Sequence, residues 1–251
     1  MPDLSLTGIP REAAEIFRPF AEDLAGRFSA VLRSLTVTGS CLTGDYMPGI
    51  SDINSVLVLA KTDVADLDIL ASMAGRSRKK RIRSPLVMTE EYIARSLDVF
   101  AIEFLDMRLF HLTVLGSDPF HKLAIERAPL RMQCERDLRG KLVNLQRAYI
   151  ACEGAAPQVK DMLLDALPGY FPLLRAMLYL VRAPKEPPAP KADVLTEAES
   201  VFSVPLNGLR ELLAAKAAGK LTRDRAAARA LFQDLYRITH DLSAAIDTLV
   251  P

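Results

Sequence analysis

The chain has 251 residues, half of them hydrophobic, and a formal net charge of +1 at pH 7. This length accommodates one large domain or two small ones with a sizeable core. A nearly neutral charge gives no global reason to expect nucleic acid or a membrane surface as a partner. The cysteines Cys41, Cys134 and Cys152 are an odd set without metal-ligand or CxxC spacing, which argues against a disulfide framework and a structural zinc site.

The termini and the apolar segments give the expected location. The first residues lack a basic segment followed by an apolar one, so we expect no signal peptide. The apolar stretch from Leu173 to Val181 contains Arg175 and is far shorter than the roughly 20 residues of a membrane span. We therefore expect a cytoplasmic protein without membrane association.

The first half of the chain alternates helix and strand patterns. Apolar residues at three-to-four spacing predict a helix from Pro10 to about Arg33. Further along we predict strands over 35–38, 53–60, 81–88 and 99–107, and a strand or extended connection over 109–115. Helices are predicted over 66–74, capped by Thr62-Asp63 and stopped by Gly75, and from the cap Thr89 to Ala94. This order indicates an α/β (α+β) domain with a small mixed sheet over residues 1–118.

Beyond Pro119 the pattern is helical throughout. A long helix is predicted after Pro129, and a helical stretch over 159–181 is interrupted at Pro168-Gly169. Thr196-Glu197-Ala198-Glu199 has the form of a capping box and predicts a helix start at Thr196. The last two helices are predicted from Pro205 to Gly219 and from the cap Thr222 to Leu249. Residues 119–251 are therefore predicted to form a helical bundle.

The most informative motif joins the first two predicted strands. Thr38-Gly39-Ser40 ends one strand, and Asp52-Ile53-Asn54 begins the next after a loop. Side chains at i and i+2 of a strand point the same way, so Asp52 and Asn54 face one pocket. A Gly-Ser turn lets the backbone and a hydroxyl approach a phosphate, and acidic or amide oxygens suit a hard metal ion.

This motif resembles the nucleotidyltransferase signature of the DNA polymerase β superfamily, and is similar in particular to the small antibiotic nucleotidyltransferases. The resemblance implies a nucleoside triphosphate as partner, with Gly39 and Ser40 at its phosphates. It also implies Mg²⁺ held by Asp52, by Asn54 at the family's second carboxylate position, and by a third acid. Ile102-Glu103-Phe104 and Leu105-Asp106-Met107 both fit that third position. On a strand the two acids would face opposite sides, and we favour Glu103, with Asp106 as the other candidate catalytic acid.

The departure at Asn54 leaves three interpretations open. The chain transfers a nucleoside monophosphate to a small-molecule or protein acceptor, or it binds nucleotide without chemistry, or it keeps the fold only as an interaction platform. The acceptor, the preferred base and an oligomeric state stay open as well.

A basic run, Arg76-Ser77-Arg78-Lys79-Lys80-Arg81-Ile82-Arg83, lies at the predicted helix-to-strand turn. It could bind nucleic acid, polyphosphate or a triphosphate tail. The alternative is a solvated turn near a helix C-terminus, where cations are favoured. No aromatic residue is interleaved in the run and the chain has no Trp, which argues against single-strand binding.

Overall fold

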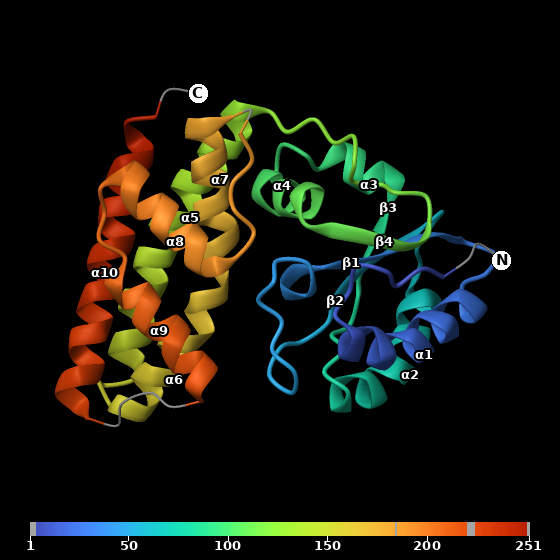
Figure 1. Ribbon diagram of the computed structural model, residues 1–251, viewed down its shortest axis with the longest axis horizontal. Coiled ribbons are helices and arrows are strands. Elements are labelled where there is room, and N and C mark those ends of the chain that lie inside the picture. The colour runs from blue at the N-terminus through green and yellow to red at the C-terminus, as the bar shows by residue number, and fades with distance from the viewer. Residues whose placement is uncertain (1–3, 184, 220–223, 250–251) are drawn as a thin grey trace. The chain divides into compact units, whose positions relative to one another are not determined.

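The computed structural model describes residues 4–183, 185–219 and 224–249. The chain divides into two compact units, one of residues 1–98 and 104–125 and the other of residues 99–103 and 126–251. Figure 1 shows the elements of both. The boundary predicted after residue 118 stays a prediction. The predicted class is confirmed, because one unit is built on a mixed sheet and the other from helices.

The sheet of the first unit has four strands in the order β3-β2-β1-β4. Their bounds are β1 (Leu32–Thr38), β2 (Asn54–Leu59), β3 (Leu86–Thr89) and β4 (His111–Gly116). β1 pairs antiparallel with β2 and with β4, whereas β2 and β3 run parallel. The register sets Thr38, the last residue of β1, opposite Asn54, the first residue of β2. The predicted strands over 35–38 and 53–60 and the strand alternative for 109–115 are therefore confirmed.

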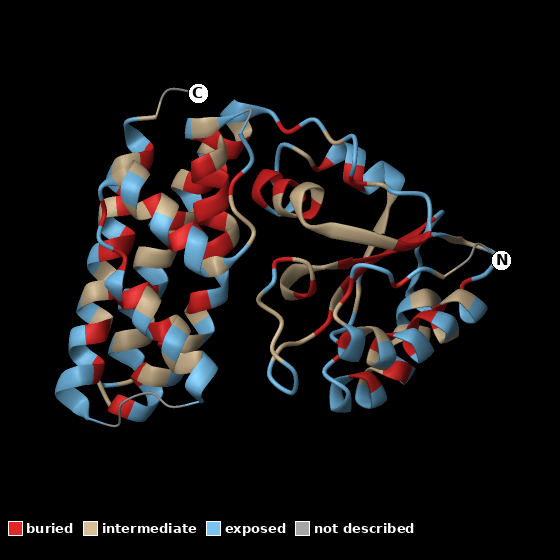
Figure 2. Ribbon diagram, viewed as in Figure 1, coloured by how far each residue is buried: buried red, intermediate tan, exposed pale blue. Residues whose placement is uncertain are grey.

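The core of this unit lies between the sheet and two helices, α1 (Arg11–Arg27) and α2 (Val64–Lys79). Phe17 and Leu24 of α1 pack in one cluster with Leu35 of β1 and Leu57 of β2, and all four are fully buried or nearly so. Figure 1 shows α3 (Glu90–Arg95) and α4 (Ala101–Leu109) on the opposite side of the sheet. The buried central residues of β1 and β2 appear red in Figure 2. Both faces of these two strands are thus covered.

Helix α2 begins as predicted but ends later. Asp63 is its N-cap, and the reciprocal hydrogen bonds between Asp63 and Asp66 form a capping box. The prediction that Gly75 stops the helix is wrong, because Gly75 continues it and a Cβ there would meet open space. The left-handed turn falls instead on Arg81, with φ 56°. The strand predicted over 81–88 correspondingly shrinks to β3, preceded by a single bridge between Ile53 and Ile82.

The strand predicted over 99–107 is wrong, because these residues lie mostly in helix α4. Ala101, Ile102, Phe104 and Leu105 are buried, whereas Glu103 is exposed and Asp106 half-buried. Apolar pairs separated by acids three residues apart are a helical pattern. The apolar content of the segment favoured a strand, but the spacing of its polar residues matches the helix.

The second unit is a bundle of helices, as predicted. Its elements are α5 (Arg127–Ala151), α6 (Ala156–Ala166), η2 (Leu167–Gly169), α7 (Tyr170–Arg182), α8 (Lys191–Phe202), α9 (Asn207–Ala218) and α10 (Arg225–Asp247). Helix α7 is buried along nearly its whole length (Figure 2) and packs against α5 and α8. Tyr170 of α7 and Thr239 of α10 share a buried hydrogen bond of 2.6 Å, which satisfies both hydroxyls inside an apolar core.

Helices α8 and α10 begin at Lys191 and Arg225. The predicted start at Thr196 is wrong: α8 begins at Lys191, and the Thr196 hydroxyl donates to the carbonyl of Ala192 inside the helix. The Glu199 carboxylate accepts a hydrogen bond of 2.7 Å from Arg210. Thr196 and Glu199 therefore make other contacts and do not form a capping box. Thr222 lies outside the described residues, and Asp224 caps α10 by accepting from the backbone N–H of Ala227.

Across the described ranges of the chain, no helix is both long enough and apolar enough to cross a membrane.

Candidate functional site

The Gly-Ser turn forms a short 3₁₀ segment, η1 (Gly39–Cys41), directly after β1. Gly39 has φ 78°, and its carbonyl accepts a hydrogen bond of 2.9 Å from the backbone N–H of Leu42. A Cβ placed on Gly39 would lie 3.0 Å from Nδ2 of Asn54. The turn therefore needs glycine for its left-handed backbone, and the Asn54 amide lies against it. The sequence motif is brought together at this point of the β1–β2 pair.

Cys41 is the last residue of η1, and it faces the core. Its side chain is buried in the core cluster, and burial raises the pKa of the thiol to about 11. The thiol is therefore protonated at neutral pH and is not a nucleophile there. Cys41 serves as a small apolar residue that anchors η1 to the core.

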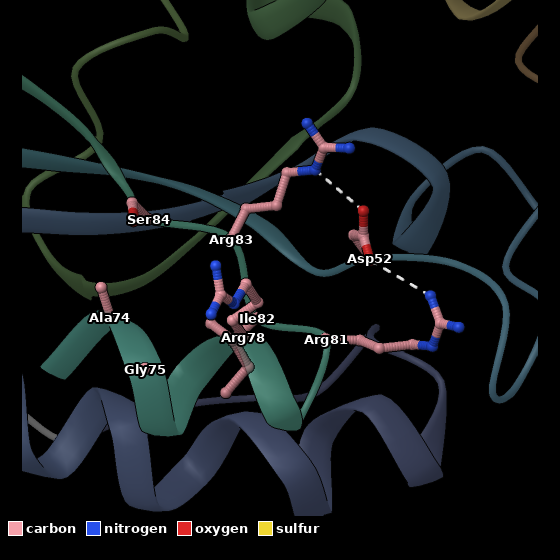
Figure 3. Close-up of a pocket in the computed structure, with 8 residues that line it drawn as sticks. All are labelled: Asp52, Ala74, Gly75, Arg78, Arg81, Ile82, Arg83 and Ser84. Atoms are coloured by element: carbon pink, nitrogen blue, oxygen red, sulfur yellow. Dashed lines mark hydrogen bonds and ion pairs between the residues drawn. The ribbon is translucent and has the colours of Figure 1, made fainter. Parts of the chain in front are cut away.

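Asp52 is held between two arginines, as Figure 3 shows. Nε of Arg83 donates to Oδ2 of Asp52 at 2.8 Å, and Nη1 of Arg81 lies 3.6 Å from Oδ1. Nη1 of Arg81 also donates to the carbonyl of Ile50 at 3.1 Å. The Asp52 carboxylate thus faces two guanidinium groups.

The backbone explains why the two arginines flank this acid. Ile53 forms a parallel bridge with Ile82: its N–H donates to the carbonyl of Arg81 at 2.8 Å, and its carbonyl accepts from the N–H of Arg83 at 3.0 Å. Arg81 and Arg83 are therefore fixed one residue to either side of the bridge, next to the residue that precedes Ile53.

The arginines and Asp52 line a surface pocket of about 660 Å³. Its other lining residues come from the end of α2 and the segment before β3: Ala74, Gly75, Arg78, Ile82 and Ser84. In Figure 3 the Arg78 side chain rises from α2 between the helix and the segment that carries Arg83. Three arginines and one carboxylate face this pocket, so its charge is strongly positive.

The two candidate third acids are not on a strand, because both lie on α4. Glu103 belongs to the helical unit, where its carboxylate accepts a hydrogen bond of 2.8 Å from Nε2 of Gln133. Asp106 belongs to the sheet unit, and its carbonyl accepts from the N–H of Phe110. The roles proposed for Glu103 and Asp106 in catalysis, and for Glu103 in metal binding, stay predictions.

The residues around Asp52 do not fit the magnesium site that the resemblance implies. Mg²⁺ prefers several carboxylate oxygens, but the Asp52 carboxylate is engaged by Arg81 and Arg83, and Asn54 offers a neutral oxygen. The segment beside Asp52 in the sheet carries arginines, not an acid. Within the described part of the chain, no group of three or more His, Cys, Asp or Glu side chains is placed to hold a metal ion.

The sequence motif gives no sign that Arg81 and Arg83 are partners of Asp52. The basic run that contains them predicts either a solvated turn or a contact with nucleic acid, polyphosphate or a triphosphate tail. A strand–helix–strand order could have indicated the pairing, because such a unit brings the starts of two parallel strands together. The start of the β3 segment, where the arginines lie, is then expected beside the start of β2.

Four features are consistent with a nucleotidyltransferase-type fold. They are the mixed four-stranded sheet, the Gly-Ser turn after β1, the Asp52–Asn54 pair at the start of β2 and the accompanying helical unit. A solved structure has the same overall fold: spectinomycin adenyltransferase AAD(9) from Enterococcus faecialis, solved with ATP and spectinomycin. Its TM-score with this chain is 0.57 at 12% sequence identity, and the match covers 90% of this chain and 98% of that one. At this identity the likeness shows the fold alone. No protein-family model matches this sequence, and no curated protein matches it.

Proposed function

We propose that the chain has a nucleotidyltransferase-like function in which a nucleoside triphosphate binds at the Gly39–Ser40 turn. The observation that carries this proposal is the contact of Gly39 with Asn54 at the ends of paired strands. A glycine with φ 78° leaves the turn open for close approach, and the Ser40 hydroxyl is suited to donate to a phosphate oxygen. A protein of the same fold was solved with ATP, which supports this choice of ligand.

Transfer of the nucleoside monophosphate is the reaction we propose first. An acceptor oxygen would attack the α-phosphorus, and pyrophosphate would leave. We propose two acids for this step. One is Asp52, and the other is either Glu103 or Asp106, which takes the acceptor's proton. The structure of similar fold was solved with spectinomycin, which supports a small-molecule acceptor.

Nucleotide binding without transfer is the second candidate, and a specific observation favours it. Asn54 replaces a carboxylate, and Arg83 and Arg81 occupy the carboxylate of Asp52. A site of this composition retains contacts for phosphate but offers few ligands for the metal ions that align a transfer reaction.

Calorimetric titration with ATP tests the shared part of both candidates. We expect binding by the whole chain and a loss of about tenfold in affinity for Ser40→Ala, the cost of one hydrogen bond to a charged group. Ser117→Ala, at an exposed serine outside the turn, is the control and should bind like the wild type. Equal affinities of the two variants, or no ATP binding at all, would reject the proposal.

Release of pyrophosphate separates the two candidates. ATP is incubated with the chain and spectinomycin, or with a panel of small hydroxyl- and amine-bearing acceptors, and pyrophosphate is measured with and without Mg²⁺. Acceptor-dependent release identifies transfer. Binding without release in every combination identifies the binding module.

A further inference from the structure

The pocket beside Asp52 has the composition of a site for anions. Arg78, Arg81 and Arg83 line it, and among its described lining residues Asp52 is the one carboxylate. Three positive charges and one negative charge leave an excess of two positive charges. Guanidinium groups bind phosphate oxygens through paired, charge-assisted hydrogen bonds.

The arginines are held in place by backbone contacts. The bridge between Ile53 and Ile82 fixes the Cα positions of Arg81 and Arg83, and the Nη1 of Arg81 is tied to the carbonyl of Ile50. The left-handed φ of 56° at Arg81 shows that the surrounding structure imposes this backbone. A ligand would therefore meet arginines whose backbone positions are already set, which lowers the backbone entropy lost on binding.

The carboxylate of Asp52 shows how an oxyanion sits between Arg83 and Arg81, at 2.8 and 3.6 Å from their nitrogens. The side chains of Asp52 and Arg83 are 30% and 70% exposed, so water screens this ion pair and it is weak. A multiply charged anion can outcompete a single carboxylate for the same guanidinium groups.

We infer that this pocket is a binding site for a polyphosphate chain that needs no divalent metal, and that Asp52 is an internal occupant that the ligand displaces. The guanidinium groups supply the positive charge that a metal ion would otherwise bring to the phosphates. The triphosphate of a nucleotide and free inorganic polyphosphate are the two sources of this chemistry. For the first source the inference rests on the proposed function, whereas for the second it stands alone.

The test is calorimetric titration of the whole chain with inorganic tripolyphosphate in EDTA. We expect binding in EDTA and about a tenfold loss of affinity for Arg83→Ala. Lys79→Ala is the control: it removes the same charge from the same basic run, at an exposed residue that does not line the pocket. Because an exposed charge outside the pocket would not contact the ligand, this variant should bind within about twofold of the wild type.

The change Asp52→Asn tests displacement by the sign of its effect. If the ligand displaces Asp52, removing the carboxylate charge raises tripolyphosphate affinity in EDTA by several-fold. An unchanged or lowered affinity would overturn the inference. The variant removes a weak ion pair that water screens, so we expect it to fold, and far-ultraviolet circular dichroism checks this.

Two further measurements are made. One distinguishes a nucleotide triphosphate from inorganic polyphosphate as the ligand, and the other distinguishes failure of this inference from failure of the proposed function. ATP and tripolyphosphate are compared in EDTA: equal dependence on Arg83 assigns the triphosphate of the nucleotide to this pocket. If ATP binds with a loss for Ser40→Ala but neither anion responds to Arg83→Ala, the inference fails while the proposed function stands. If a single-stranded oligonucleotide binds and tripolyphosphate does not, the pocket is part of a nucleic-acid surface and the inference is wrong.

Discussion

Gly39 and Asn54 lie against each other across β1 and β2, so that a Cβ on the glycine would come within 3.0 Å of the amide nitrogen of the asparagine. This pair joins the two halves of a motif that are separated by a loop in the sequence. It also couples the backbone of a turn to the side chain at the candidate second ligand position.

Gly39→Ala should destabilise the chain by about 2 kcal/mol, because an L-residue at φ 78° costs about 1–2 kcal/mol and the Asn54 amide must also move. Gly44→Ala is the matched control: its φ is 76°, and a Cβ there meets nothing within 4 Å. Urea unfolding of both variants measures the difference. Equal free energies of unfolding would show that the contact with Asn54 has no energetic weight.

Asn54→Asp should make ATP binding depend on Mg²⁺. The new carboxylate adds a hard oxygen ligand beside Asp52, so we expect affinity in Mg²⁺ to rise by roughly tenfold relative to affinity in EDTA. Asn144→Asp, at an exposed position of α5, introduces the same charge elsewhere. If both variants respond to Mg²⁺ alike, Asn54 does not belong to a metal or nucleotide site.

Gly116→Ala should be among the most damaging single changes in the sheet unit. A Cβ there would lie 1.9 Å from the carbonyl oxygen of Arg33, at φ 81° where β4 meets β1. We expect a loss of about 3 kcal/mol or more, or a failure to fold. Gly140→Ala on α5 meets open space and should instead stabilise by roughly 0.5–1 kcal/mol. Thermal unfolding of the two variants would contradict this account if their midpoints shifted in the same direction.

The ionised carboxylate of Asp118 makes the stability of the fold depend on pH. Its carboxylate lies 2.9 Å from Nε2 of His111 and accepts from the backbone N–H groups of Phe120 and His121. Partial burial acts to raise the pKa of Asp118, but these hydrogen bonds outweigh it and the pKa falls below its usual value of 3.8. A carboxyl whose pKa is lowered by folding stabilises the fold above its unfolded pKa, and this contribution is lost as pH falls through the lower folded pKa.

Asp118→Asn should therefore lower the free energy of unfolding at pH 7 by about 1 kcal/mol at most, since the side chain is 39% exposed and water screens it. The difference from the wild type should shrink as the pH falls below 3.8, where the wild-type carboxyl becomes protonated. Asp68→Asn, at an exposed residue of α2, serves as the control. A deficit that is the same at pH 7 and at pH 3 would show that the ionised carboxylate is not what stabilises the turn.

Much of the sheet unit was predictable because its signals are local. A run with β-branched residues, a Gly-Ser turn and a second apolar run predict the β1–β2 pair. Asp63 and Thr89 cap the helices that were expected to follow them. The failures have a common cause. Apolar content led to a strand over 99–107, although acids three residues apart match the α4 helix. Thr196 and Glu199 have the spacing of a capping box, but helix α8 begins earlier, directly after Pro190.

Local sequence is enough to predict the Gly39–Ser40 turn, the start of β2 at Asp52-Ile53-Asn54 and the helical character of the second half, because each depends on residues near one another in the chain. The partners of the Asp52 carboxylate, in contrast, depend on long-range packing. Arg83 is 31 residues away and reaches it through a parallel strand pairing that the intervening helix α2 makes possible. Such a pairing is set by packing of the helix on the sheet, so it leaves no signature in the motif itself.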